Sequence, residues 1–107
     1  MESFGEYIKS LRKQKGLNQT QLAAMLNLDM SAISKIENKK TQLKESLLNT
    51  LAEIFDLEIN LVKEKYFSDK FAREVYQNGV PETVFKVAEK KVKYYKATDV
   101  KQIDLNL

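Results

Sequence analysis

The first apolar residues of the chain recur at helical spacing. Phe4, Ile8 and Leu11 follow an i, i+4, i+7 pattern, which predicts a helix over residues 2–15. Gly16 follows, and glycine readily takes the left-handed backbone conformation that ends many helices. The pattern therefore predicts an amphipathic first helix with a defined end.

Two shorter amphipathic segments come next and are joined by a tight turn. Asn18 and Gln21 form a capping-box pattern at the start of the second helix. Asn27 falls where the turn needs a positive φ, which Asn tolerates better than any residue except Gly. Asp29 can cap a third helix over residues 30–38. The side chains expected to face inward from this helix pair are Leu22, Leu26, Ile33 and Ile36.

The remaining apolar patterns also have helical periods. They predict helices over residues 44–55, 60–77 and about 81–97, with Pro81 in the first turn of the last one. The residues that define these helices are Leu47, Leu48, Leu51, Ile54, Phe55, Leu61, Phe67, Phe71, Val75, Val84, Phe85, Ala88, Val92 and Tyr95. Residues 97–107 lack a helical period and fit a strand, a partner-bound segment or a disordered tail. With only three Gly and one Pro, the chain as a whole favours an all-α fold.

The composition argues against catalysis. The chain has 107 residues and contains no His and no Cys, so the commonest general base and the commonest metal ligands are absent. It shows no Gly-rich phosphate loop and no carboxylate pair in a plausible cleft. We therefore expect no enzymatic activity, no metal and no cofactor. No apolar run approaches the ~20 residues of a membrane helix, and the N-terminus lacks a signal-peptide core, so a cytoplasmic protein is expected.

Positive charge is concentrated in two short clusters, although the net charge is only +3. The clusters are Lys9, Arg12, Lys13 and Lys15, and Lys35, Lys39, Lys40 and Lys44. Two basic clusters on either side of one helix could bind two stretches of phosphate backbone. Each cluster alone fits a solvated surface equally well.

The segment 19–38 resembles the Cro/C1-type (XRE) helix-turn-helix family of phage repressors and bacterial regulators. The matching features are Gln19 at the opening, Ala23 at the small position, Asn27 at the turn, Ile33 and Ile36 inward, and Ile36-Glu37-Asn38 at the close. The resemblance extends over residues 4–62. It implies an all-α, lambda-repressor-like helix-turn-helix bundle with two additional C-terminal helices. Residues 1–62 would bind DNA, and residues 63–107 would serve dimerisation or partner binding.

The resemblance also implies roles for individual residues. It assigns base contacts to Met30, Ser31, Ser34 and Lys35, and phosphate contacts to Gln19, Asn38, Lys39 and Lys40. A lysine in the major groove can donate to guanine O6 or N7, and Met30 can lie against a thymine methyl group. Arg12 and Glu37 match a pair that forms a salt bridge in the family. Because the family commonly has Gly in place of Asn27 and Lys39, we expect local differences in the turn and in the loop after the third helix.

The function predicted from these features is sequence-specific binding of double-stranded DNA by a homodimer on a palindromic operator. The C-terminal region is loosely similar to extensions of small bacterial regulators that accompany DNA methyltransferases, which indicates control of a restriction–modification operon. The alternative is the antitoxin of a toxin–antitoxin pair, with the C-terminal region clamping a protein partner. Apolar area beyond what a small core needs often marks an interface. On that ground the dimer is predicted to use Phe67, Phe71, Val75, Phe85 and Val92. The alternative is that the last two helices pack on the first four within a monomer.

Overall fold

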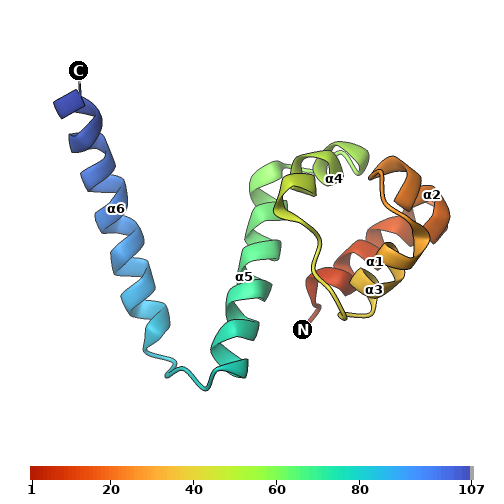
Figure 1. Cartoon of the computed structure of the whole chain (residues 1–107), viewed down its shortest axis with the longest axis horizontal. Coiled ribbons are helices and arrows are strands. Elements are labelled where there is room, and N and C mark those ends of the chain that lie inside the picture. Colours follow the sequence, from red (N-terminus) through yellow and green to blue (C-terminus); the bar gives the residue numbers. More distant parts are fainter. Residues whose placement is uncertain (107) are drawn as a thin grey trace. The chain divides into compact units, whose positions relative to one another are not determined.

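The computed structural model describes the backbone of residues 1–106 and the side chains of residues 1–99. Its elements in chain order are α1 (Phe4–Gln14), α2 (Gln19–Met25), α3 (Met30–Glu37), the short 3-10 helix η1 (Glu45–Leu47), α4 (Leu48–Ile54), α5 (Ile59–Gln77) and α6 (Val84–Asn106) (Figure 1). The backbone from residue 1 to residue 106 contains no strand, so the all-α prediction is confirmed. The chain divides into two compact units, Met1–Phe71 and the part from Ala72 onward.

The first three helices begin at side chains that cap exposed amides. Ser3 Oγ accepts the Glu6 N–H at 3.1 Å, and Asp29 Oδ1 accepts the Ala32 N–H at 2.7 Å. At the start of α2, the Asn18 and Gln21 side chains each accept the other's backbone N–H at 2.8 Å. The predicted capping box and the predicted Asp29 cap are therefore present, and each replaces water at an amide that the helix itself cannot satisfy.

Five helices end in the same way. The residue after each C-cap has a positive φ, and these residues are Gly16 (73°), Asn27 (56°), Lys39 (64°), Asp56 (52°) and Gly79 (60°). In each case the next N–H reaches back to a carbonyl of the last turn, as Leu17 does to Arg12 at 3.0 Å and Lys40 to Lys35 at 2.9 Å. This is the Schellman motif, which satisfies carbonyls at the helix end. Asn27 and Lys39 thus take the backbone conformation that Gly would supply.

The left-handed residue at the end of α4 gives a stability prediction. Asp56 pays a steric cost that glycine avoids, so Asp56→Gly should raise the free energy of unfolding by about 0.5–1 kcal/mol. Urea unfolding of the full chain measures the change. Gly16→Ala is the opposite control, because it places a Cβ at a φ of 73° and should lower stability. A destabilising Asp56→Gly would show that the aspartate side chain compensates for its strained backbone.

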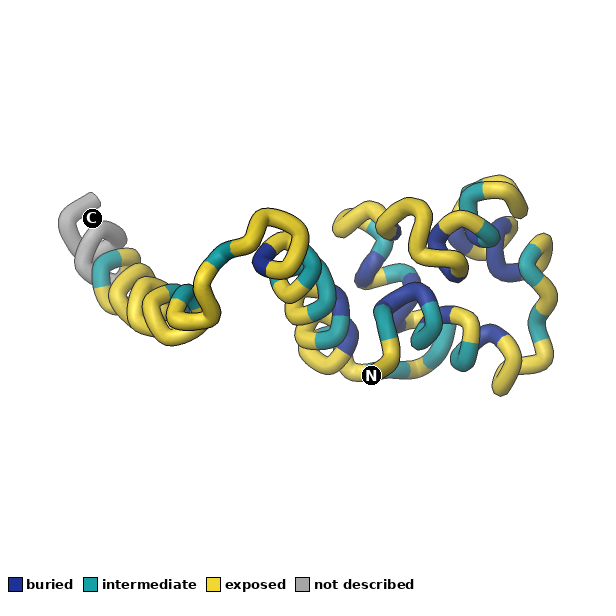
Figure 2. The backbone as a smooth tube through the Cα atoms, turned by 90° about the horizontal axis from the view of Figure 1, so that it is seen from below, coloured by how far each residue is buried: buried dark blue, intermediate teal, exposed yellow. Residues whose placement is uncertain are grey.

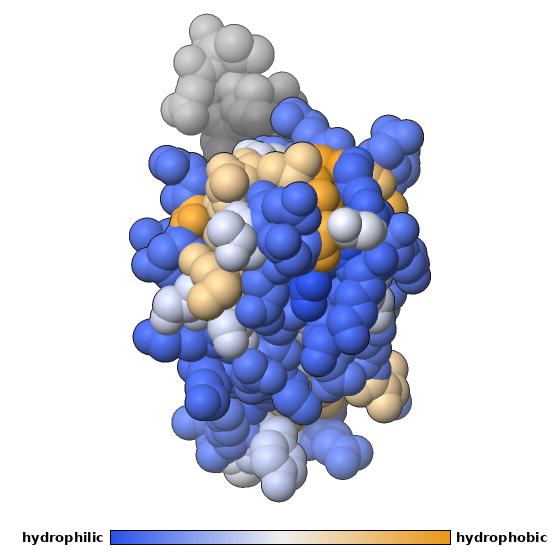
Figure 3. Space-filling view, turned by 90° about the vertical axis from the view of Figure 1, so that its right-hand side faces the viewer, coloured by the Kyte–Doolittle hydropathy of each residue, from blue (hydrophilic) through white to orange (hydrophobic). Residues whose placement is uncertain are grey.

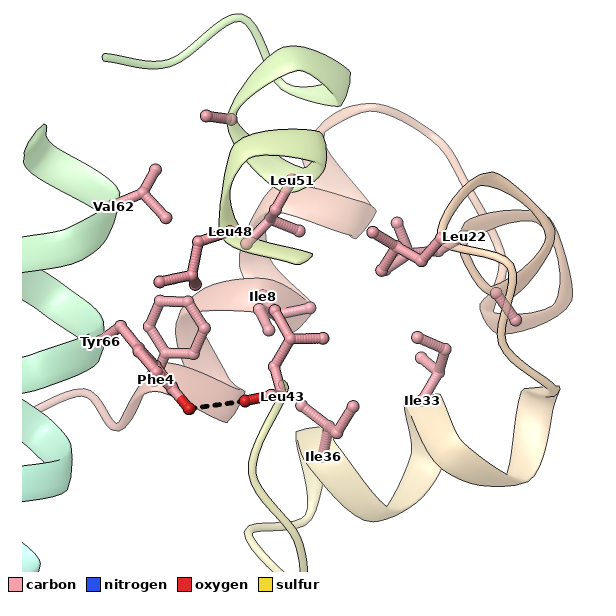
Figure 4. Close-up of a cluster of buried hydrophobic side chains, with 13 residues drawn as sticks. Phe4, Ile8, Leu22, Ile33, Ile36, Leu43, Leu48, Leu51, Val62 and Tyr66 are labelled. Atoms are coloured by element: carbon pink, nitrogen blue, oxygen red, sulfur yellow. Dashed lines mark hydrogen bonds between the residues drawn. The ribbon is translucent and has the colours of Figure 1, made fainter. Parts of the chain in front are cut away.

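The core of the first unit is formed by α1 to α5 and the loop before η1 (Figure 4). Its fully buried side chains include Ile8, Leu22, Ile33, Leu43, Leu51 and Val62. Phe4, Ile8 and the four inward residues predicted for the helix pair are in this core, whereas Leu11 is half-buried outside it. In α5, however, Leu61 and Phe67 are 41% and 43% exposed, whereas Val62 and Tyr66 are buried. The core side of α5 is therefore the side of Val62 and Tyr66, which lie one turn apart, and the sequence analysis had not singled out either residue.

The beginning of α5 is fastened to the first unit by polar contacts. The Tyr66 hydroxyl donates to the Leu43 carbonyl at 2.6 Å (Figure 4), and Asp69 Oδ2 accepts the Phe4 N–H at 3.1 Å. Lys70 forms an ion pair with Glu45 at 3.0 Å. The first unit consequently extends to Phe71, beyond the boundary predicted at residue 62.

The helix at the end of the chain differs from its prediction at both ends. It begins at Val84, and Pro81 lies in the turn before it, where the Pro81 carbonyl accepts the Val84 N–H at 3.0 Å. The backbone is helical as far as Asn106, so the prediction of a non-helical tail after residue 97 was wrong. A helix needs no amphipathic period to continue, and residues 97–106 contain neither Gly nor Pro to stop it. Side chains after residue 99 lie outside the described part.

Candidate nucleic-acid interface

α2 and α3 form a helix-turn-helix whose turn is held from both sides. Ala23 is buried, and its carbonyl accepts the Leu28 N–H at 2.8 Å. Leu28 packs partly buried against the core, and Asp29 then caps α3. The small side chain of Ala23 allows α2 and α3 to pack closely. Together, these contacts fix the direction of α3 relative to α2.

One face of α3 is available to a ligand. Ile33 and Ile36 are buried in the core, whereas Met30 is 52% exposed and Ser31 and Lys35 are exposed. The structure therefore brings these three predicted base-contacting residues together on the outer face. The fourth, Ser34, is half-buried, and its Oγ accepts a 3.4 Å hydrogen bond from the Asn38 side chain. The side of the molecule on which α2 lies in Figure 1 is dominated by hydrophilic residues (Figure 3).

Several of the predicted phosphate-contacting residues also make contacts within the chain. Asn38, Lys39 and Lys40 are exposed at the end of α3, and the Asn38 side chain donates to Ser34 Oγ. Gln19 and Lys39 are engaged within the chain, since Gln19 Nε2 donates to Glu37 Oε1 at 3.2 Å and Lys39 Nζ lies 3.1 Å from Glu6 Oε1. The hydrogen bond from Lys39, followed by its charge, lowers the pKa of Glu6.

Arg12 and Glu37 form a buried, bidentate ion pair between α1 and α3. Arg12 Nε lies 2.7 Å from Glu37 Oε2, and Arg12 Nη2 lies 3.0 Å from Glu37 Oε1. Their side chains are only 10% and 1% exposed. Arg12 Nη1 also donates to the Leu17 carbonyl at 2.9 Å, at the beginning of the link to α2. The pair therefore fixes the orientation of α3 against both preceding segments.

The environment of this pair keeps both groups charged. Burial alone would raise the pKa of Glu37, but hydrogen bonds from Arg12 and Gln19, together with the charges of Arg12 and Lys9, outweigh it and lower that pKa below its ordinary value. The hydrogen bond to Glu37 raises the pKa of Arg12, against the opposing effect of burial. These opposite shifts are expected of a hydrogen-bonded pair of opposite charges.

The basic cluster at the end of α1 has a partly internal role. Arg12 is used in the buried pair, and Lys15 Nζ donates to the Ile54 carbonyl and lies 5.8 Å from the centre of the Phe55 ring. Lys15 thereby covers the end of α4. Lys9 and Lys13 are exposed, as is Lys15 itself.

A residue that the sequence analysis did not single out sets the distance between α1 and α3. A Cβ added at Gly5 would lie 2.1 Å from the Ile36 carbonyl oxygen, so only glycine permits this approach. The sequence signal is a glycine inside an otherwise regular helical pattern, where glycine costs about 1 kcal/mol and often has a packing reason.

Within the described residues, no group of three or more His, Cys, Asp or Glu could hold a metal ion. Over the same part of the chain, no helix is long and apolar enough to cross a membrane.

Comparison with known proteins places this helix pair in a family. Residues 8–62 match the helix-turn-helix family HTH_3. The chain belongs to the Cro/C1-type (XRE) helix-turn-helix family. It is 33% identical over 96 residues to the HTH-type transcriptional repressor RghR of Bacillus subtilis strain 168, covering 88% of this chain and 69% of RghR. It is 32% identical over 62 residues to the ImmF control region 10 kDa protein of Bacillus phage phi105, covering 58% of this chain and 69% of that protein.

A solved structure shows the same fold. The P22 c2 repressor, crystallised with synthetic operator 9T, superimposes with a TM-score of 0.53 at 24% identity, over 58% of this chain and 94% of the repressor chain. Membership of the XRE family makes this protein a DNA-binding transcriptional regulator and not an enzyme.

Proposed function

We propose that this XRE-family protein binds a palindromic DNA operator as a homodimer, with α3 of each copy in the major groove. The observation that supports this most directly is the outer face of α3, where Met30, Ser31 and Lys35 project from a helix locked by Arg12 and Glu37. Lys35 supplies a donor for guanine, and Met30 supplies an apolar surface for a thymine methyl group.

The predicted phosphate-contacting residues before and after α3 would bind the DNA backbone. Asn38 and Lys40 follow α3, and Gln19 at the start of α2 would contact a further phosphate. Lys39 would reach a phosphate only by exchanging its ion pair with Glu6. These contacts set the register of the helix on the duplex, whereas α3 reads the sequence.

The homodimer follows from the size of one recognition helix. A single helix contacts only a few base pairs, so family members need two helices placed about one DNA turn, roughly 34 Å, apart. The genes that the protein regulates are a separate question, for which the proposal is a restriction–modification operon and the alternative is a toxin–antitoxin operon. A restriction–modification operon predicts genes for a methyltransferase and an endonuclease beside this one, whereas an antitoxin would co-purify with a second small protein encoded beside it.

Removing the lysine that faces the groove should change sequence preference. Lys35→Ala should weaken binding to the selected operator by about 1–3 kcal/mol and relax the base preference at one position of each half-site. Because Lys35 points away from the core, the fold should persist. Binding-site selection followed by fluorescence anisotropy measures both effects. An unchanged base preference would mean that Lys35 does not contact a base.

Removing the lysine beyond the helix should act on all sequences alike. Lys40→Ala should lower the affinity for specific and random duplexes equally, and should reduce the slope of log K against log salt by about one unit. Titrations at several salt concentrations give that slope. If Lys40→Ala instead altered the discrimination between operators, Lys40 would be reading bases and the proposed register of α3 would be wrong.

A further inference from the structure

The net positive charge of the chain is concentrated in α6. Residues 84–99 contain five lysines and two acidic residues, so their net charge is +3. The whole chain also has a net charge of +3, which means that the charges outside this segment cancel. The first unit, Met1–Phe71, contains 11 basic and 10 acidic residues. The excess of positive charge that attracts a polyanion over a distance therefore comes mostly from α6.

Three of these lysines share one side of the helix. Lys86, Lys90 and Lys93 are spaced four and three residues apart, and we call them the α6 lysine face. All three are exposed, and no side chain from residue 84 to residue 99 is buried (Figure 2). At the rise of an α-helix they extend along about 10 Å, and each strand of a DNA duplex carries about three phosphates over that length.

The other charges of the described part of α6 lie at the edges of this face or away from it. Glu89 Oε1 lies 3.1 Å from Lys93 Nζ, with the two side chains 66% and 75% exposed. Exposed ion pairs of this kind contribute little to stability, so a phosphate can take the place of the carboxylate. Lys96 follows the same edge as Glu89. Lys91 lies about 100° round the helix from Lys90 and so points away from the face.

A membrane surface fits α6 less well than DNA does. A basic helix with an apolar side can lie on anionic lipid, with its apolar side inserted between the headgroups. In α6, however, Asp99 is exposed and lies on the side of Val92 and Tyr95, where it would meet those headgroups. A DNA backbone would contact only the α6 lysine face, and Asp99 lies on the opposite side of the helix.

We propose that the α6 lysine face binds the phosphate backbone of duplex DNA, as a second contact separate from the helix-turn-helix. This contact goes beyond the operator contacts proposed for α3 and requires only the DNA binding of the family. Because α6 is joined to the DNA-binding unit, a duplex held by that unit is at high effective concentration for the lysines. Contacts to phosphates add affinity but carry no direct sequence information.

Two neighbouring lysines give a matched test. Lys90→Gln and Lys91→Gln each remove one charge from the same helix, but only Lys90 belongs to the α6 lysine face. For the full chain, Lys90→Gln should reduce the slope of log K against log salt by about one unit per bound copy, and K86Q/K90Q by about two. Lys91→Gln should change the slope far less. Glutamine and lysine have similar helix propensities, and circular dichroism verifies that the variants remain helical.

The duplexes decide whether the contact is independent of sequence. The selected operator is extended by one DNA turn, roughly 34 Å, at each end, and a random duplex of the same length is measured beside it. K86Q/K90Q should weaken binding to both by the same factor, at least about tenfold at low salt. An unchanged slope in K86Q/K90Q, or equal changes in Lys90→Gln and Lys91→Gln, would overturn the proposal, since the second result would indicate diffuse attraction only.

Vesicles test the rival surface. The full chain and K86Q/K90Q are sedimented with vesicles of phosphatidylcholine and phosphatidylserine in equal parts, and we expect no difference between them. Vesicle binding that K86Q/K90Q abolishes, together with an unchanged salt slope on DNA, would assign the α6 lysine face to a lipid surface and overturn the proposal. The proposed operator function fails separately, through an unchanged base preference in Lys35→Ala, while the salt slope measured on the random duplex would still stand.

Discussion

Gly5→Ala should destabilise the protein by about 3 kcal/mol, at the upper end of what overpacking normally costs. The added Cβ would lie 2.1 Å from the Ile36 carbonyl oxygen and 3.2 Å from the carbonyl carbon, and both are backbone atoms. A flexible side chain could rotate away, but here α1 or α3 must move as a whole. Since α3 carries the outer face that would read DNA, operator affinity should fall together with stability.

The sign of this effect makes the test decisive. At an exposed helical position, Gly→Ala normally stabilises by about 0.5–1 kcal/mol. Urea unfolding of Gly5→Ala beside Lys9→Ala, an exposed α1 control, separates crowding from helix propensity. Unchanged or increased stability in Gly5→Ala would mean that α1 and α3 can separate at no cost.

Breaking the Arg12–Glu37 pair should have an effect of similar or larger size. Arg12→Ala or Glu37→Ala leaves the other charge buried without its partner, and such losses cost about 3–5 kcal/mol, whereas exposed pairs are worth about 0–1 kcal/mol. The double replacement Arg12→Met with Glu37→Leu should recover much of the loss, because no buried charge remains. A double-mutant cycle from urea unfolding measures the coupling energy between Arg12 and Glu37. Zero coupling would mean that this ion pair does not stabilise the fold.

The same pair gives a pH dependence with a defined sign. The pKa of Glu37 is lowered in the folded state, so its contribution to stability is fully present above the unfolded value of about 4.3 and is lost as pH falls through the folded pKa. The coupling between Arg12 and Glu37 should therefore be constant near neutrality and decrease in acid. Repeating the cycle at pH 7 and at about pH 3 tests this. A coupling that survives full acidification would show that charge contributes little to it.

The sequence by itself determined the features that depend on residues within about four positions. The Asn18–Gln21 capping box, the Asp29 cap and the positive φ at Asn27 were predicted because their partners are adjacent in the chain. The helix pair and its inward isoleucines followed from periodicity. The Arg12–Glu37 contact, at a separation of 25 residues, came from the family resemblance and not from spacing.

Only the tertiary structure decided contacts between distant segments. The residues around Gly5 do not predict its close approach to Ile36, and those around Lys39 do not predict its ion pair with Glu6. The inner face of α5 was also undecided locally, because the helix has apolar residues on more than one side. Contact with Leu43 and the rest of the core selected Val62 and Tyr66. Local interactions limit which elements form, but their pairing depends on which surfaces fit, and that is a property of the packed chain.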